Sequence, residues 1–297
     1  MAASLAVTTD VLDIANRVSV QFGRPTLFSV ERLDASVART AGSLACLIVP
    51  GLGVVSRSEM EAELASDGSK RAIDLIRTAD GVVASSCAST FLVAESGRLD
   101  GRRATTSWFL APTFAQRYPA VRLAVDEVVV EDGSVITGGA AMAQMDVMLR
   151  LVTRLAGADI ARTCARYLLA DERSSQATYV MLGSLTASDA TLVKAEQWVR
   201  QNLVRGDIAV DEIAEICGLH TKTLYRRMVA ATGLAPSRFV QRLRLEVATD
   251  LLRDTQLNVD QIAIRVGYAE ASTLRRILRR ELGLSASEIR MRSRFAA

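Results

Sequence analysis

The stretch "IAEICGLHTKTLYRRMVAATGLAPSRFVQRLR", residues 213–244, has a second copy in "IAIRVGYAEASTLRRILRRELGLSASEIRMR", residues 262–292. The copies are offset by 49 residues at Gly218 and Gly267, and by 50 residues at the glycine that closes each copy. Each copy predicts a short helix, a turn that contains glycine, and a second helix with a basic face. Because two helices joined by such a turn form a helix-turn-helix unit, the sequence predicts two of these units in tandem.

The second helix of each copy carries three polar residues at helical spacing, on the face opposite its leucines. These residues are Lys222, Tyr225 and Arg226 in the first copy, and Ser272, Arg275 and Arg276 in the second. Exposed arginines near the start of such a helix suit contact with phosphates and bidentate reading of guanine in the major groove. The alternative is a solvated charged face, but the pattern occurs twice. Both triplets are therefore predicted to bind double-stranded DNA.

Charge is unevenly distributed along the chain, although its formal net charge is only +3. Residues 186–297 carry 18 Lys and Arg against 13 Asp and Glu, whereas residues 1–185 carry 18 against 20. A basic C-terminal third on a near-neutral body favours an anionic partner for that third.

The first half of the chain alternates strand-like and helix-like segments. The runs "LACLIVPG" (44–51) and "GVVASSC" (81–87) predict strands, and "VRLAVDEVVVEDGSVITGG" (121–139) predicts two strands joined by a turn at Asp132-Gly133. Helical periodicity fills the segments between them. This alternation predicts an α/β layer fold with a mostly parallel sheet.

After residue 159 only helical patterns follow, and this change divides the chain. We expect an α/β domain over residues 1–180, a linker over residues 181–190 and an all-α domain over residues 191–297. The linker sequence, "MLGSLTASDA", is small, polar and weakly periodic. Ser188 is a candidate N-cap for the helix that follows.

The C-terminal region resembles the AraC/XylS family of bacterial transcriptional regulators over "IAEICGLHTKTLYRRM", "GLAPSRFVQRLRLEVATDLL" and "IAIRVGYAEASTLRRILRRELGLSASEIR". The resemblance implies two helix-turn-helix units in one domain, joined by a long helix over "PSRFVQRLRLEVATDLLRDT". It places the base-reading positions of the family on the same six residues of the two triplets. Ala286 departs from the pattern, because the family usually has proline there.

The N-terminal region resembles the glutamine-amidotransferase-like ThiJ/PfpI superfamily over "LIVPG", "VVASSCASTFLVAESGRLDGRRATT", "ITGGAAMAQMDVMLRLV" and "RSSQATYV". The resemblance implies a flavodoxin-like parallel sheet whose first strand precedes the helix "SLAVTTDVLDIANRV". Almost nothing lies ahead of that helix, so either the true start lies upstream of Met1 or the sheet lacks this strand. Joined to an AraC-like domain, this domain resembles a regulator class in which a former enzyme core acts as sensor or dimerisation module.

Cys87 lies where enzymatic relatives have a cysteine on a tight strand-to-helix turn, with a histidine as its base. The resemblance places that histidine at Ser107, and the only histidine of the chain, His220, lies in the first helix-turn-helix unit. A Cys-His pair within the N-terminal domain is therefore excluded, and we expect no enzyme. For Cys87 three alternatives stay open: packing or pocket lining, redox or covalent sensing, and catalysis. For the protein, the alternative is a ThiJ/PfpI-type cysteine hydrolase or amidase with a DNA-binding tail.

A pocket at the carboxyl ends of the strands is expected to bind a small-molecule effector. The residues that the resemblance places there are Asp10, Gly51, Cys87 and Ser107. RNA polymerase is a further candidate partner. A second copy of the chain is another, since a homodimer is the default for regulators of this shape.

Neither a cofactor nor a metal is expected. The four cysteines have no C-x-x-C spacing and the chain has a single histidine, whereas a zinc site needs clustered ligands. Scattered cysteines, apolar runs too short to span a bilayer and a start without a signal peptide together predict a cytoplasmic protein with no membrane segment.

Overall fold

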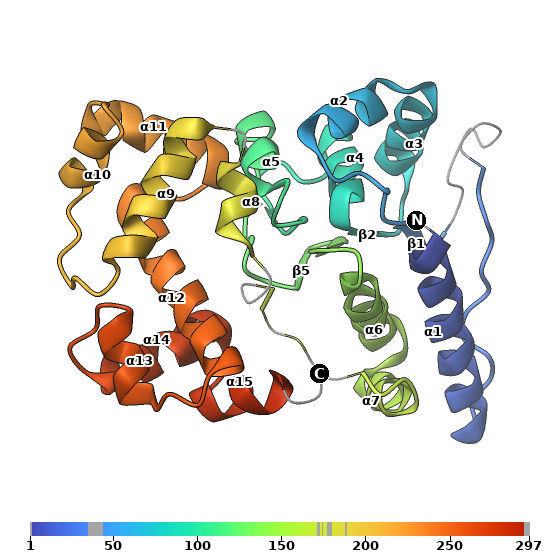
Figure 1. Cartoon of the computed structure of the whole chain (residues 1–297). Coiled ribbons are helices and arrows are strands. Elements are labelled where there is room, and N and C mark those ends of the chain that lie inside the picture. Colours follow the sequence, from blue (N-terminus) through green and yellow to red (C-terminus); the bar gives the residue numbers. More distant parts are fainter. Residues whose placement is uncertain are drawn as a thin grey trace. The chain divides into compact units, whose positions relative to one another are not determined.

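The computed structural model of the chain describes residues 2–34, 44–170, 173, 175–176, 180–187 and 189–293. The chain divides into two compact units, residues 1–176 and residues 177–297. The first unit combines a sheet with helices, and the second is built from helices (Figure 1). None of the helices in the described part of the chain combines the length and apolar character that a membrane span requires.

The first unit contains a four-stranded sheet in the order β1-β2-β6-β5. β1, β2 and β6 are parallel, and β5 is antiparallel to β6. The hairpin turn expected at Asp132-Gly133 is confirmed, and Gly133 has a φ of 61°. A separate two-stranded parallel sheet, β3 with β4, contacts β5. The strands are β1 (Cys46–Val49), β2 (Val82–Ser86), β3 (Arg103–Ala104), β4 (Arg122–Leu123), β5 (Val129–Asp132) and β6 (Val135–Gly138).

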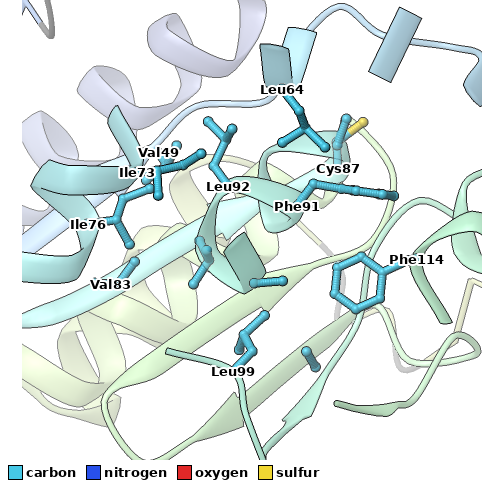
Figure 2. Packing of buried hydrophobic residues seen from close by; sticks show 14 of the residues in the cluster. Val49, Leu64, Ile73, Ile76, Val83, Cys87, Phe91, Leu92, Leu99 and Phe114 are labelled. Carbon is cyan, nitrogen blue, oxygen red and sulfur yellow. The ribbon is translucent and has the colours of Figure 1, made fainter. Parts of the chain in front are cut away.

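Helices cover both faces of the four-stranded sheet, which confirms the predicted α/β layer fold. Successive residues of β2 point to opposite faces: Val83 packs with one cluster, and Val82 and Ala84 pack with the other. Figure 2 shows the first cluster, which includes Phe91 and Phe114. The first cluster takes side chains from α2 (Arg57–Ala65), α3 (Asp67–Thr78), α4 (Thr90–Glu95) and α5 (Ala111–Arg117), and the second from α1 (Ala2–Gln21), α6 (Ala143–Ala156) and α7 (Ala158–Tyr167).

β1 forms one edge of this sheet. No strand precedes α1 in the described part of the chain, where β1 pairs only with β2. A cavity of about 800 Å³ lies beside this edge, lined mainly by apolar side chains of α1, α3, β1 and the segment 27–33. Asn16 holds that segment, because its Oδ1 accepts hydrogen bonds from the backbone N–H groups of Leu27 and Phe28 at 2.8 and 2.9 Å.

The second unit packs its helices around two apolar clusters, and both clusters include side chains of α12. The buried side chains of α12 belong to one cluster up to Leu243 and to the other from Leu245 onward, and the partly buried Val247 packs against both. α12 is therefore the spine that joins two halves of this unit. The helices are α8 (Leu182–Thr186), α9 (Ala190–Asn202), α10 (Val210–Ile216), α11 (Thr221–Thr232), α12 (Pro236–Asp254), α13 (Val259–Arg265), α14 (Ala271–Leu282) and α15 (Ala286–Ser293).

The stretch expected as a linker, residues 181–190, is partly helical. It contains α8, and Leu182 is fully buried in the first cluster of the second unit. An apolar side chain that reaches a core is stabilised by burial whatever the polarity of its neighbours in sequence. Asp189 caps α9, since its Oδ1 accepts from the backbone N–H of Thr191 at 2.9 Å. Ser188, the expected cap, lies outside the described residues.

The last helix begins at Ala286, where the family pattern has proline. A capping box surrounds this start. The Oγ of Ser285 accepts from the backbone N–H of Glu288 at 3.3 Å, and the Oε2 of Glu288 accepts from the backbone N–H of Ser285 at 2.6 Å. These two reciprocal hydrogen bonds give the backbone N–H groups of Ser285 and Glu288 acceptors, so the helix start is stabilised without proline.

Candidate nucleic-acid interface and cysteine elbow

Both predicted helix-turn-helix units are present, and each turns at a glycine with positive φ. α10 leads through Gly218, at φ 66°, to α11, and α13 leads through Gly267, at φ 82°, to α14. The residue after each glycine donates its N–H to the carbonyl five residues earlier, at 2.9 Å in the first unit and 2.8 Å in the second. Left-handed backbone favours glycine because L side chains are strained there. The repeated glycines are therefore a requirement of the two turns.

The six residues expected to contact DNA lie at exposed positions of α11 and α14. On the opposite faces of these helices Leu224 and Leu274 are fully buried, as their spacing predicts. Within the described part of the chain, Arg226 and Arg276 make no hydrogen bond or ion pair, so their guanidinium groups are available to an anion. The exposed residues are Lys222, Tyr225 and Arg226 on α11, and Ser272, Arg275 and Arg276 on α14.

The basic face of α14 continues beyond its triplet, which sequence reasoning did not note. Arg279 and Arg280 are exposed one helical turn further on. Arg279 pairs with Glu288 at 3.2 Å, and Arg280 pairs with Glu281 at 2.6 Å. The signal was present in the sequence, because arginine pairs recur at a spacing of four residues.

Cys87 occupies a backbone elbow between β2 and α4. Its φ is 60°, in the left-handed region that residues other than glycine seldom adopt, and its side chain is buried. Ser86 and Ser89 form a capping box around it, and the Oγ of Ser89 also donates to the carbonyl of Val49 at 3.0 Å. The elbow is thus tied to the end of β1, and Figure 2 shows Cys87 close to the buried ring of Phe91.

The structure brings together three of the four residues expected in a ligand pocket. The Oγ of Ser107 donates to the Sγ of Cys87 at 3.0 Å, and a Cβ added to Gly51 would lie 3.6 Å from the Cβ of Cys87. Asp10 is not part of this group, since its side chain is exposed on α1. α1 reaches the elbow through Ser4, whose Oγ accepts from the backbone N–H of Gly51 at 3.0 Å. Ser4 and Asp10 lie on different faces of the helix.

The elbow is buried and supplies hydroxyl groups without an imidazole. Cys87 and Ser107 are both buried, and the cavity beside β1 is lined by other residues. His220 belongs to the second unit, so residues 1–176 contain no histidine. Among the residues that the structure describes, no group of three or more His, Cys, Asp or Glu side chains could hold a metal. All four thiols are free, and burial raises the pKa of the Cys46 thiol to about 12.

Gln144 of α6, which sequence reasoning missed, forms hydrogen bonds both to the end of β2 and to α1. Its Oε1 accepts from the Oγ of Ser86 at 2.6 Å and from the Oγ of Ser4 at 3.2 Å. Its Nε2 donates to the Oγ1 of Thr8 at 2.9 Å. A buried amide with these partners fixes the start of α1 against the end of β2.

Gln176, the last residue of the first unit, was also missed as a site residue. Its buried Nε2 donates to the carbonyls of Val125 and Thr106 at 2.6 and 3.0 Å, and its Oε1 accepts from the backbone N–H of Ala140 at 3.2 Å. The Oγ1 of Thr106 donates in turn to the carbonyl of Cys87 at 2.9 Å. The end of the first unit is therefore anchored beside the elbow. The only sequence signal was that Gln176 lies within the matched stretch "RSSQATYV".

Comparison with known protein families identifies the class of both units. Residues 29–154 match the model of the DJ-1/PfpI family, and residues 199–292 match a helix-turn-helix domain model. The chain therefore carries a DJ-1/PfpI domain followed by an AraC-type helix-turn-helix domain.

Two relatives are named as transcriptional regulators. The chain is 29% identical to the HTH-type transcriptional regulator CdhR of Pseudomonas aeruginosa over 202 residues, which are 67% of this chain and 60% of that protein. It is 33% identical to the HTH-type transcriptional activator RhaS of Enterobacter sp. (strain 638) over 110 residues, which are 37% of this chain and 39% of that protein. The chain thus spans less than two thirds of the length of these relatives.

Solved structures resemble each unit separately. Drosophila melanogaster DJ-1beta is 20% identical, with a TM-score of 0.40, over 57% of this chain and 91% of that one. The DNA-binding domain of AdpA, solved in complex with a target DNA, is 28% identical, with a TM-score of 0.32, over 36% of this chain and 95% of that one.

Proposed function

We propose that this protein is a sequence-specific, DNA-binding transcriptional regulator. The observation that carries the proposal is the pair of exposed triplets at equivalent positions of α11 and α14. Recognition helices of successive helix-turn-helix units suit adjacent major-groove segments about one helical turn, ~10 bp, apart. The regulators CdhR and RhaS among the relatives support the same role.

The DJ-1/PfpI domain, in this proposal, binds a small molecule, a second copy of the chain, or both, and thereby biases DNA binding. We assign ligand contacts to Gly51, Cys87 and Ser107, with Ser4 in the place that was expected for Asp10. The anchoring of Gln176 beside Cys87 supports a link between this site and the segment that follows the domain. A ligand can shift DNA affinity only by its differential affinity for two states of the protein, typically ~1–3 kcal/mol.

Catalysis is the less favoured role for the elbow. A nucleophilic cysteine needs a neighbouring base or a depressed pKa, and the neighbour of Cys87 is a serine hydroxyl that donates to its sulfur. We therefore assign Cys87 to packing or ligand contact. The same proposal places the regulator in the cytoplasm, with RNA polymerase as a further partner. An amidase or glyoxalase rate in the wild-type protein that is lost in Cys87→Ser would contradict this assignment.

The test of DNA binding is selection of duplexes from a random pool by the full chain at low salt. We expect a specific duplex to be enriched, and its affinity to fall steeply as salt rises, because lysines and arginines displace counterions from phosphates. Arg226→Ala is expected to reduce that enrichment, by about 1–3 kcal/mol of binding free energy on the enriched duplex. If the wild-type chain enriches no duplex at low salt, the proposed function is wrong.

A further inference from the structure

Arg244 is a buried cation in the middle of α12 that belongs to neither DNA-facing triplet. It lies between Leu243, the last buried α12 member of the first apolar cluster, and Leu245, the first buried α12 member of the second. Only 7% of its surface is exposed. Arg244 therefore lies at the position on α12 where packing changes from the first apolar cluster of the second unit to the other.

The guanidinium of Arg244 holds the backbone of the loop that leads into the first helix-turn-helix unit and of the turn within the second. Its Nη2 donates to the carbonyls of Arg205 and Gly206, at 2.8 and 3.2 Å, in the loop before α10. Its Nη1 donates to the carbonyl of Gly267, at 3.3 Å, in the turn before α14. The same guanidinium lies over the ring of Tyr268, with its carbon 5.5 Å from the ring centroid. One side chain thus bridges the loop before the first helix-turn-helix unit and the turn of the second.

The two bridged segments are in direct backbone contact. A Cβ added to Gly267 would lie 2.2 Å from the carbonyl oxygen of Leu203 and 2.8 Å from that of Arg205. A Cβ added to Gly206 would lie 3.4 Å from the carbonyl oxygen of Gly267. The contact leaves no room for a side chain at Gly267, so a small displacement of one segment moves the other.

The chemistry of this site suits arginine in particular. Within the described residues no carboxylate pairs with Arg244, and its charge is balanced by three carbonyl dipoles and the face of Tyr268. A planar guanidinium with five donors in a fixed fork can reach two separate carbonyl groups at once. A lysine ammonium is a point charge on a flexible stem and cannot hold both in one geometry.

We propose that Arg244 is a positioning residue that sets the separation and orientation of the recognition helices α11 and α14. It thereby selects DNA in which the two half-sites, the segments contacted by α11 and by α14 of one chain, lie at one fixed spacing. The inference rests on the proposed DNA binding and adds to it a determinant of spacing that contacts no base.

The experiment uses the full chain and the duplex that the wild-type protein enriches from a random pool. Three duplexes are compared: the enriched one, one with about two base pairs inserted between the half-sites, and one with a single half-site. The variants are Arg244→Met, Arg244→Lys and the matched control Arg253→Met, which removes the same charge from an exposed position of α12.

We expect the wild-type protein and Arg253→Met to bind the enriched duplex at least about tenfold more tightly than the inserted one. Arg244→Met is expected to lose most of this ratio while its affinity for the single half-site matches that of Arg253→Met. If Arg244→Met does not fold, as judged by circular dichroism, Arg244→Lys carries the test, with the ratio reduced in the same direction. A wild-type ratio in a folded Arg244 variant, or an equal loss on all three duplexes, overturns the proposal.

Failure of DNA binding itself has a separate readout. If the wild-type chain enriches no duplex, hydrogen exchange of the unbound proteins decides the role of Arg244. Faster exchange at residues 203–206 and 266–268 in an Arg244 variant than in Arg253→Met supports the positioning role. Unchanged exchange at both segments overturns it.

Discussion

Arg276 offers the sharpest test of DNA reading by a single side chain, because it is exposed on α14 and makes no ion pair within the described residues. Arg276→Ala is expected to weaken binding to the enriched duplex by about 1–3 kcal/mol, with a smaller loss on random DNA, since a base contact is lost only on the specific site. Arg280→Ala is the matched control, because it removes one charge from the same helix at a side chain already paired with Glu281. Fluorescence anisotropy measures both affinities. Equal losses on the two duplexes would reduce Arg276 to a phosphate contact.

Cys46 is a second single residue with a testable effect, because its thiol makes the free energy of unfolding depend on pH. Burial raises the pKa of its thiol from 9.0 to about 12. Between these values the unfolded chain releases the proton while the folded chain keeps it, so the free energy of unfolding falls as pH rises. We expect Cys46→Ala to lose less stability than the wild type across this window, measured by urea denaturation at several pH values. Identical pH profiles for the two proteins would show that the thiol titrates alike in both states.

The two turn glycines separate backbone strain from packing at the scale of elements. A Cβ at Gly218 meets nothing within 4 Å, whereas a Cβ at Gly267 meets the carbonyl oxygen of Leu203 at 2.2 Å. Gly218→Ala is therefore expected to cost about 1–2 kcal/mol through positive φ alone, and Gly267→Ala about 4 kcal/mol or more. Guanidinium denaturation followed by circular dichroism compares them. A Gly267→Ala loss no larger than that of Gly218→Ala would argue against the close approach of the two segments.

Helices and strands could be predicted from the sequence wherever apolar residues recur with the period of one helix or one strand. The hairpin at Asp132-Gly133 and the helix-turn-helix repeats were predicted in this way, because turn chemistry and the period of apolar residues are local properties. The linker was not. Residues 181–190 are polar enough to predict a loop, and only the core that receives Leu182 explains why α8 forms there.

Because the whole molecule divides into two units, we expect a substitution at Gln176 to destabilise the first unit alone. Gln176→Ala removes a buried amide and leaves the N–H of Ala140 and the carbonyls of Thr106 and Val125 without this partner. We expect the first unit to lose about 1–3 kcal/mol of unfolding free energy and the second to be unaffected, because these contacts all lie within residues 1–176. Hydrogen exchange by mass spectrometry follows both units in one sample. Matched losses in both would show that the units unfold together.

The sequence by itself determined the two classes of fold, the faces of α11 and α14, and the absence of a Cys-His pair in the first unit. These follow from period, turn chemistry and residue counts, which need no knowledge of long-range contacts. Only the tertiary structure decided that Ser4 and not Asp10 reaches the elbow, that Gln176 is anchored there, and that Arg244 bridges two helix-turn-helix units. Each of these depends on partners 23 to 70 residues away. Such partners are set by how elements pack, and a side chain's position on its own helix or strand does not specify them.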